Sequence, residues 1–151
     1  MEILIVYGSQ YGNTQKLAQA MARALSPPHH VRVVHAPVAR TLSAEGVDLL
    51  FVGAPTQMRG LRLLAKPFLI GLEGRGFGGV RAAAFDTRMG DFAQTVASEA
   101  IARHLVGAGC RLVAEPESFL VLGLDGPLAN GEVERAAAWA VEVAQSVATP
   151  A

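Results

Sequence analysis

The chain has 151 residues, with 13 basic and 13 acidic side chains and a hydrophobic content of 51%. This size suits one domain with a single core, which we expect to span residues 1–151. A formal charge of zero argues against nonspecific nucleic-acid binding, which needs a basic excess. No apolar run approaches the ~20 residues of a membrane-spanning helix. The lone Cys110 leaves no internal disulfide or cysteine zinc site and suggests a reducing, cytoplasmic location.

The first elements along the chain are a strand, a turn and a helix. Residues 3–7 are apolar throughout and predict a buried strand. Residues 15–25 have the spacing of an amphipathic helix, and a Ser-Pro-Pro sequence at 26–28 ends it. A strand that passes into a helix through a polar, glycine-bearing turn predicts a phosphate-binding loop. The reason is that the N-terminus of a helix presents free N–H groups and the positive end of its dipole.

The donors in this turn are neutral. Ser9 and Thr14 supply hydroxyl groups and Asn13 an amide, while Gly12 lets the backbone approach an anion. No lysine lies within the turn, so the neutral groups would do most of the binding. The alternative is a turn that only caps the helix. The residues that we predict to contact a phosphate are Ser9, Gln10, Tyr11, Gly12, Asn13 and Thr14.

The rest of the chain alternates strands and helices. Strands are predicted where apolar residues run together, at residues 31–34, 48–52, 80–85 and 111–114. Residues 119–122 either continue the last of these or pair with it. Helices are predicted from helical spacing at residues 61–72, 91–106 and 132–147. Apolar strands between helices imply an α/β fold, a three-layer sandwich around a five-stranded parallel sheet in the order 2-1-3-4-5.

Ligands of open parallel sheets bind beyond the carboxyl ends of the strands, where the strand order reverses. Two further loops should therefore lie beside the first. After the third strand the predicted cofactor contacts are Pro55, Thr56, Gln57, Met58, Arg59 and Gly60. After the fourth strand they are Thr87, Arg88, Met89 and Gly90. The simpler interpretation of these loops is structural, with Thr56 capping a turn and Asp86 and Asp91 capping a strand end and a helix.

The motifs resemble those of a known family. The sequence Ser9-x-Tyr11-Gly12-Asn13-Thr14 resembles the phosphate loop of flavodoxins, and residues 7–16 resemble more closely the flavodoxin-like domains of flavodiiron proteins. Residues 53–56 resemble the loop that lies along the isoalloxazine ring in flavodiiron-type and quinone-reductase-type domains. Residues 115–119 and 126–135 resemble segments of uncharacterised bacterial flavodoxin-like proteins. The resemblance implies a flavodoxin-like fold that binds FMN and exchanges electrons with a redox partner protein.

The chain departs from that family in two respects. Many flavodoxins carry an aromatic residue in the third loop, but none lies between Asp86 and Asp91, and Phe92 is the nearest. Binding should be weaker without it, since an aromatic pair contributes about 1 kcal/mol beyond its area, unless Tyr11 or Met58 substitutes. Flavodoxins that carry electrons are usually acidic, whereas this chain is neutral and has arginines on or beside the flavin loops. Because positive charge stabilises an anion, we expect a less negative potential for the fully reduced flavin. The arginines concerned are Arg59, Arg62 and Arg88.

Two other functions remain open from the sequence. One is an FMN-dependent reductase that takes electrons from a nicotinamide and passes them to a quinone or similar acceptor. The other is a binding module that keeps the fold but has lost flavin. The GxGxxG match at residues 74–79 precedes a strand instead of following one, so it lacks the context of a dinucleotide site. None of the histidines has metal-ligand spacing, and no residues predict a catalytic group.

Overall fold

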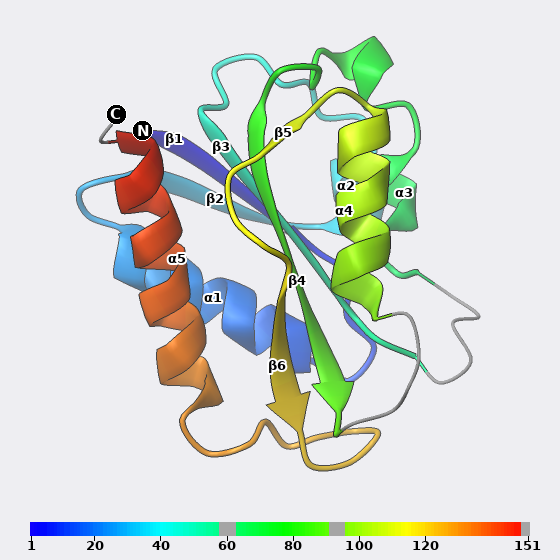
Figure 1. Cartoon of the computed structure of the whole chain (residues 1–151), viewed down its shortest axis with the longest axis vertical. Helices are drawn as coiled ribbons and strands as arrows, with labels where there is room; N and C mark the ends of the chain where they lie inside the picture. The colour runs from blue at the N-terminus through cyan, green and yellow to red at the C-terminus, as the bar shows by residue number, and fades with distance from the viewer. Residues whose placement is uncertain (58–62, 91–95, 149–151) are drawn as a thin grey trace.

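The computed structural model describes residues 1–57, 63–90 and 96–148. A parallel sheet runs through the molecule with helices on both faces, as Figure 1 shows. The strand order is β2-β1-β3-β4-β5, and β6 also pairs with β4. This confirms the predicted α/β sandwich and its strand order. The strands are β1 (Glu2–Tyr7), β2 (His30–His35), β3 (Leu49–Pro55), β4 (Arg81–Met89), β5 (Arg111–Leu112) and β6 (Glu117–Val121).

Alternate residues of the central strands face opposite layers. Ile3 and Ile5 of β1 pack in one apolar cluster with α1 and α5, whereas Leu4 and Val6 pack in the other with α2, α3 and α4. Because both faces of the sheet are covered, residues 3–6 of β1 and 49–52 of β3 are all apolar. None of the helices in the described part is long and apolar enough to cross a bilayer. The helices are α1 (Asn13–Leu25), α2 (Ala36–Ala39), α3 (Lys66–Leu69), α4 (Ala97–Gly107) and α5 (Glu132–Ala148).

The last strand of the sheet is interrupted. Arg111 of β5 pairs with Arg81 of β4, and Glu117 of β6 pairs with Phe85. The chain thus takes six residues to advance from 111 to 117 while β4 takes four from 81 to 85. Both pieces run parallel to β4, so the segment predicted at 119–122 continues the fifth strand after a bulge. This pairing, together with β3, extends β4 to Met89, beyond the predicted end at residue 85.

The prediction of a helix over residues 61–72 is wrong for residues 63–72, the part of that range that the structure describes. Only the single turn α3 forms, with Pro67 in its first turn, followed by a short 3₁₀ turn at Glu73–Arg75. The Arg75 guanidinium donates hydrogen bonds to the carbonyl oxygens of Phe68 and Ile70. These bonds satisfy the carbonyl groups that a longer helix would have used.

The helix predicted over residues 91–106 begins later than expected. Val96 is extended, with φ −80° and ψ 153°, and α4 starts at Ala97. Residues 91–95 lie outside the described part of the chain. The first two residues of α4, Ala97 and Ser98, donate their backbone N–H groups to Thr56 and Asp86. These bonds favour a helix that starts at Ala97.

A substitution at Gly53 tests how closely β3 and β4 pack. Gly53 is the register partner of Phe85, and a Cβ atom at position 53 would collide with the Phe85 ring. We expect Gly53→Ala to lower the free energy of unfolding by about 1–3 kcal/mol, because overpacking forces neighbouring atoms to move. Urea unfolding measures this. Gly74→Ala is the control, since a Cβ there meets nothing within 4 Å; equal effects of the two variants would contradict the packing.

Candidate functional site

The carboxyl ends of β1, β3 and β4 meet around one pocket. The empty space among the lining residues, counted together with the open solvent at the mouth, is about 620 Å³. Gly12 and Gly90 do not line it, and Met58, Arg59 and Gly60 lie outside the described residues. The predicted residues that line it are Ser9, Gln10, Tyr11, Asn13, Thr14, Pro55, Thr56, Gln57, Thr87, Arg88 and Met89.

Hydrogen bonds tie the three predicted loops to one another. Gln57 Nε2 donates to Gln10 Oε1 over 2.6 Å, which joins the first loop to the second. The backbone N–H of Thr56 donates to the carbonyl of Thr87 over 2.7 Å, which joins the second to the third. The hydroxyls of Thr14 and Thr87 are 3.1 Å apart, which joins the third to the first. Hydrogen bonds therefore connect all three loops of the pocket wall.

The first loop closes through its own polar groups. Gly12 has φ +88°, a value that favours glycine, and its N–H donates to Ser9 Oγ over 3.0 Å. Its carbonyl accepts from the N–H of Lys16 and so begins α1. A Cβ at Gly12 would meet nothing within 4 Å, so the loop needs this glycine for its backbone angle. The Ser9 oxygen accepts inside the loop, and its O–H still has a proton to donate.

Asn13 and Thr14 begin α1 and are almost wholly buried. Asn13 is 7% exposed and Thr14 is 1% exposed, yet both line the pocket. Thr14 contacts the hydroxyl of Thr87, so its side chain does not face hydrocarbon alone. The first turn of α1 contains no acidic residue, and the positive end of the helix dipole is left for a ligand.

Thr56, the residue after β3, and Asp86 of β4 cap the N-terminus of α4. The N–H of Ala97 donates to Thr56 Oγ1, and the N–H of Ser98 donates to Asp86 Oδ2, both over 2.8 Å. Asp86 therefore caps a helix from the end of a strand. Its carboxyl is fully buried, and its Oδ1 has no hydrogen-bond partner in the described part of the chain. Burial raises the pKa of Asp86, and the Ser98 hydrogen bonds, Ser118 and the charge of Arg88 oppose that shift in part.

The pocket has an apolar wall that the sequence analysis missed. Val96, Val121 and Leu124 line it, and the last two come from the end of β6 and the loop that follows. The sequence signal was present, because residues 122–125 follow a strand of the parallel sheet at the edge where β4 also ends. Tyr11, 54% exposed, is the one aromatic residue among the lining residues that the structure describes.

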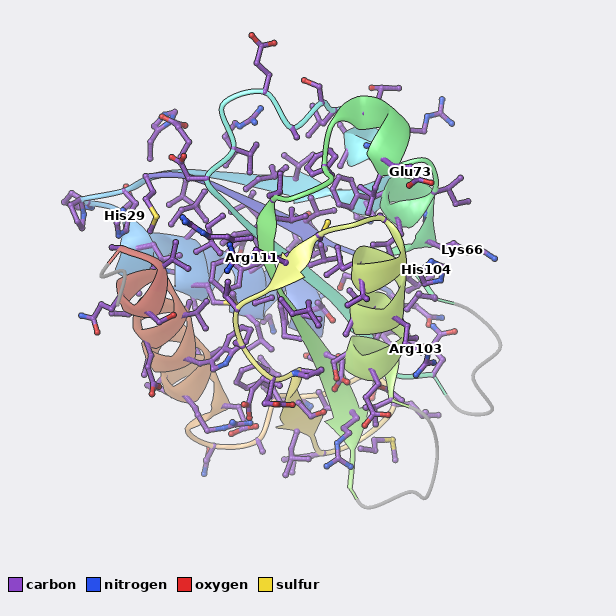
Figure 2. The ribbon with its side chains drawn as sticks, turned by 45° about the horizontal axis from the view of Figure 1, so that its top comes forward. His29, Lys66, Glu73, Arg103, His104 and Arg111 are labelled. Atoms are coloured by element: carbon purple, nitrogen blue, oxygen red, sulfur yellow. The ribbon has the colours of Figure 1, made fainter. Side chains whose placement is uncertain are left out.

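A second hollow lies between α3 and α4, away from the pocket. Glu73, Arg103 and His104 line it; Figure 2 shows Arg103 and His104 on α4 and Glu73 on the turn above that helix. All three are exposed and of mixed charge, so we assign no ligand to it. No group of three or more histidine, cysteine or acidic residues that could hold a metal occurs in the described ranges.

Comparisons with known proteins agree with the fold. The family model described as flavodoxin matches residues 5–139. The chain belongs to the flavodoxin family. Oxidised flavodoxin 2 from Bacillus cereus is 25% identical, with a TM-score of 0.76, and the match covers 97% of this chain and 99% of that one. No match was found among curated protein sequences.

Other solved structures share the architecture at lower identity. A flavodoxin from the domain Archaea has a TM-score of 0.78 at 19% identity, over 99% of this chain and 100% of that chain. The flavodiiron protein from Giardia intestinalis has a TM-score of 0.77 at 17% identity, over 97% of this chain but 36% of that one. This flavodoxin-family chain therefore has the fold of one domain of that longer protein, as the sequence resemblance predicted.

The buried Asp86 carboxyl should make stability depend on pH. Because its pKa is raised on folding, the folded protein binds more protons than the unfolded chain between the ordinary and the raised pKa. The free energy of unfolding should therefore fall as pH rises through that window. Asp86→Asn removes this titration and can still accept the Ser98 N–H bond. The free energy of unfolding of the variant minus that of the wild type should therefore be greatest at neutral pH and should decrease toward acid pH. Urea unfolding across pH measures this, and parallel profiles would contradict it.

Proposed function

We propose that the chain binds FMN noncovalently in this pocket and carries electrons to and from a redox partner protein in the cytoplasm. The observation that carries the proposal is the convergence of Ser9, Asn13 and Thr14, at the start of α1, with the loops after β3 and β4. Membership of the flavodoxin family supports it, because ligands of this fold bind where the strand order reverses.

The residues of the pocket fit a phosphorylated flavin. Of the lining residues in the described part, Arg88 alone carries a charge at neutral pH, and it is positive. A phosphate therefore meets neutral donors and no carboxylate of the pocket wall. The remaining wall combines amide and hydroxyl side chains with the apolar Val96, Val121 and Leu124. That combination suits a ring system with one polar edge.

Each part of the wall has a separate task in this proposal. Ser9, Asn13 and Thr14, with the free N–H groups of α1, would hold the phosphate. Thr56 and Gln57 would offer hydrogen bonds to the polar edge of the ring, and Tyr11 and the apolar residues would exclude water. The bound flavin supplies the redox chemistry, and the protein sets its position and potential.

Adding FMN to the purified protein tests the proposal. Saturable binding should appear as a change in flavin fluorescence. At a free concentration of 100 times Kd, FMN should stabilise the folded state by about 2.7 kcal/mol, measured as a rise in Tm. The carrier function predicts little NAD(P)H oxidation without a partner protein, whereas steady turnover would indicate a reductase. A protein that binds no FMN would overturn the proposal and leave a fold without flavin.

Arg88 provides a second test, directed at the reduction potential. Its guanidinium donates to the carbonyl of Gly90 over 2.6 Å and lines the pocket. A fixed positive charge there should favour the anionic, fully reduced flavin. We expect Arg88→Gln to lower the potential of the last reduction step by roughly 30–60 mV, up to tenfold in a one-electron equilibrium constant. Arg103→Gln, on the outer side of α4, is the charge-matched control. Equal potentials in the Arg88 variant and the wild type would refute this role.

A further inference from the structure

The loop between β6 and α5 lies against the phosphate loop. It runs along the edge of the sheet where β4 and β6 end (Figure 1). Gly126 in this loop has φ +101°, and a Cβ there would lie 2.7 Å from Oδ1 and 2.8 Å from Nδ2 of Asn13. Real Cβ atoms do not approach polar atoms so closely, so the backbone of Gly126 fills the space beside the Asn13 amide.

Asn13 is thereby confined to the wall of the pocket. Asn13 is 7% exposed and still lines the pocket. Within residues 1–57, 63–90 and 96–148 no hydrogen bond holds its amide, so packing against Gly126 restricts its position. Its amide atoms are not among the buried polar atoms that lack a partner in the described residues, and Nδ2 can donate to an anion that enters the pocket.

The same loop presents an apolar side chain to the pocket. Leu124 lines the pocket and is 63% exposed, so it has surface to bury against a ligand. Two backbone hydrogen bonds close the loop. The N–H of Leu122 donates to the carbonyl of Pro127 over 2.9 Å, and the N–H of Gly126 donates to the carbonyl of Gly123 over 3.1 Å. A loop closed in this way holds Leu124 and Gly126 in a fixed relation to each other.

We propose that residues 122–127 form an additional binding loop of the pocket, an inference that rests on the proposed function. Gly126 is a positioning residue that holds the Asn13 amide for the phosphate. Leu124 covers the part of the ligand that FMN shares with riboflavin, which lacks the phosphate. The loop thus selects phosphorylated flavin through one residue and contributes binding area through the other.

Affinities for FMN and riboflavin separate these two roles. Gly126→Ala should weaken FMN binding about tenfold or more, the equivalent of ~1.4 kcal/mol, and leave riboflavin binding unchanged, since the added Cβ displaces Asn13. Leu124→Ala should weaken both ligands by the same factor, about threefold to tenfold, because it removes apolar contact. Leu122→Ala is the matched control. Leu122 is 70% exposed in the same loop and does not line the pocket, so neither affinity should change.

A double variant guards against a folding defect at Gly126, where alanine is strained by the positive φ. Asn13→Ala removes the atoms that the new Cβ would meet. We expect Asn13→Ala alone to reduce the preference for FMN over riboflavin about as much as Gly126→Ala does, since Ser9, Thr14 and the N–H groups of α1 remain. We expect the double variant Asn13→Ala/Gly126→Ala to match it, because the two residues act through one contact. An additive loss in the double variant would contradict the positioning role.

The outcomes also separate this inference from the proposed function. Suppose that the wild type binds FMN, but that Gly126→Ala weakens the binding of FMN and of riboflavin equally, or changes neither affinity. The positioning role is then wrong and the cofactor assignment stands. If Leu124→Ala changes neither affinity, the loop does not cover the ligand. If the wild type binds neither flavin, the proposed function and this inference fail together.

Discussion

Thr87 joins the three loops of the candidate site. Its carbonyl accepts the N–H of Thr56 from the end of β3, and its hydroxyl contacts that of Thr14 at the start of α1. Three segments far apart in the sequence are thus fixed around one residue near the end of β4. Because hydrogen bonds among buried groups are costly to break, this junction gives the pocket a defined shape. The interpretation of the pocket as a cofactor site depends on that shape.

In the sheet beneath the junction, close packing of side chains adds to the backbone hydrogen bonds between β3 and β4. Gly53 has no side chain because the Phe85 ring of the next strand fills that space. Phe85 also packs edge-on against Phe119 and Trp139, with ring centroids 6.4 and 6.1 Å apart. Trp139 belongs to α5, so this aromatic group links β4, β6 and the last helix. It keeps the end of β4, and hence Thr87, in register with its neighbours.

Charge is concentrated at the end of β4. Asp86 is buried and caps α4, while Arg88, two residues on, lines the pocket. Side chains two residues apart in a strand lie on one face, so the arginine charge partly offsets the cost of burying the carboxylate. One short segment therefore anchors a helix and sets the electrostatic potential of the pocket.

The sequence by itself determined the strand order and the position of the polar turn between β1 and α1. Apolar strands alternating with helices specify a covered parallel sheet, and the polar turn at residues 8–12 joins the first strand to the first helix. Both signals are local, so they can be read from neighbouring residues. The sequence did not reveal that α3 is a single turn, because the Arg75 side chain, and not a further helical turn, supplies donors to the carbonyl groups of Phe68 and Ile70. Nor did it place Leu124 in the pocket or Gly126 against Asn13, since more than 100 residues separate the members of that last pair. Only the folded sheet, which brings the ends of distant strands to one edge, could decide those contacts.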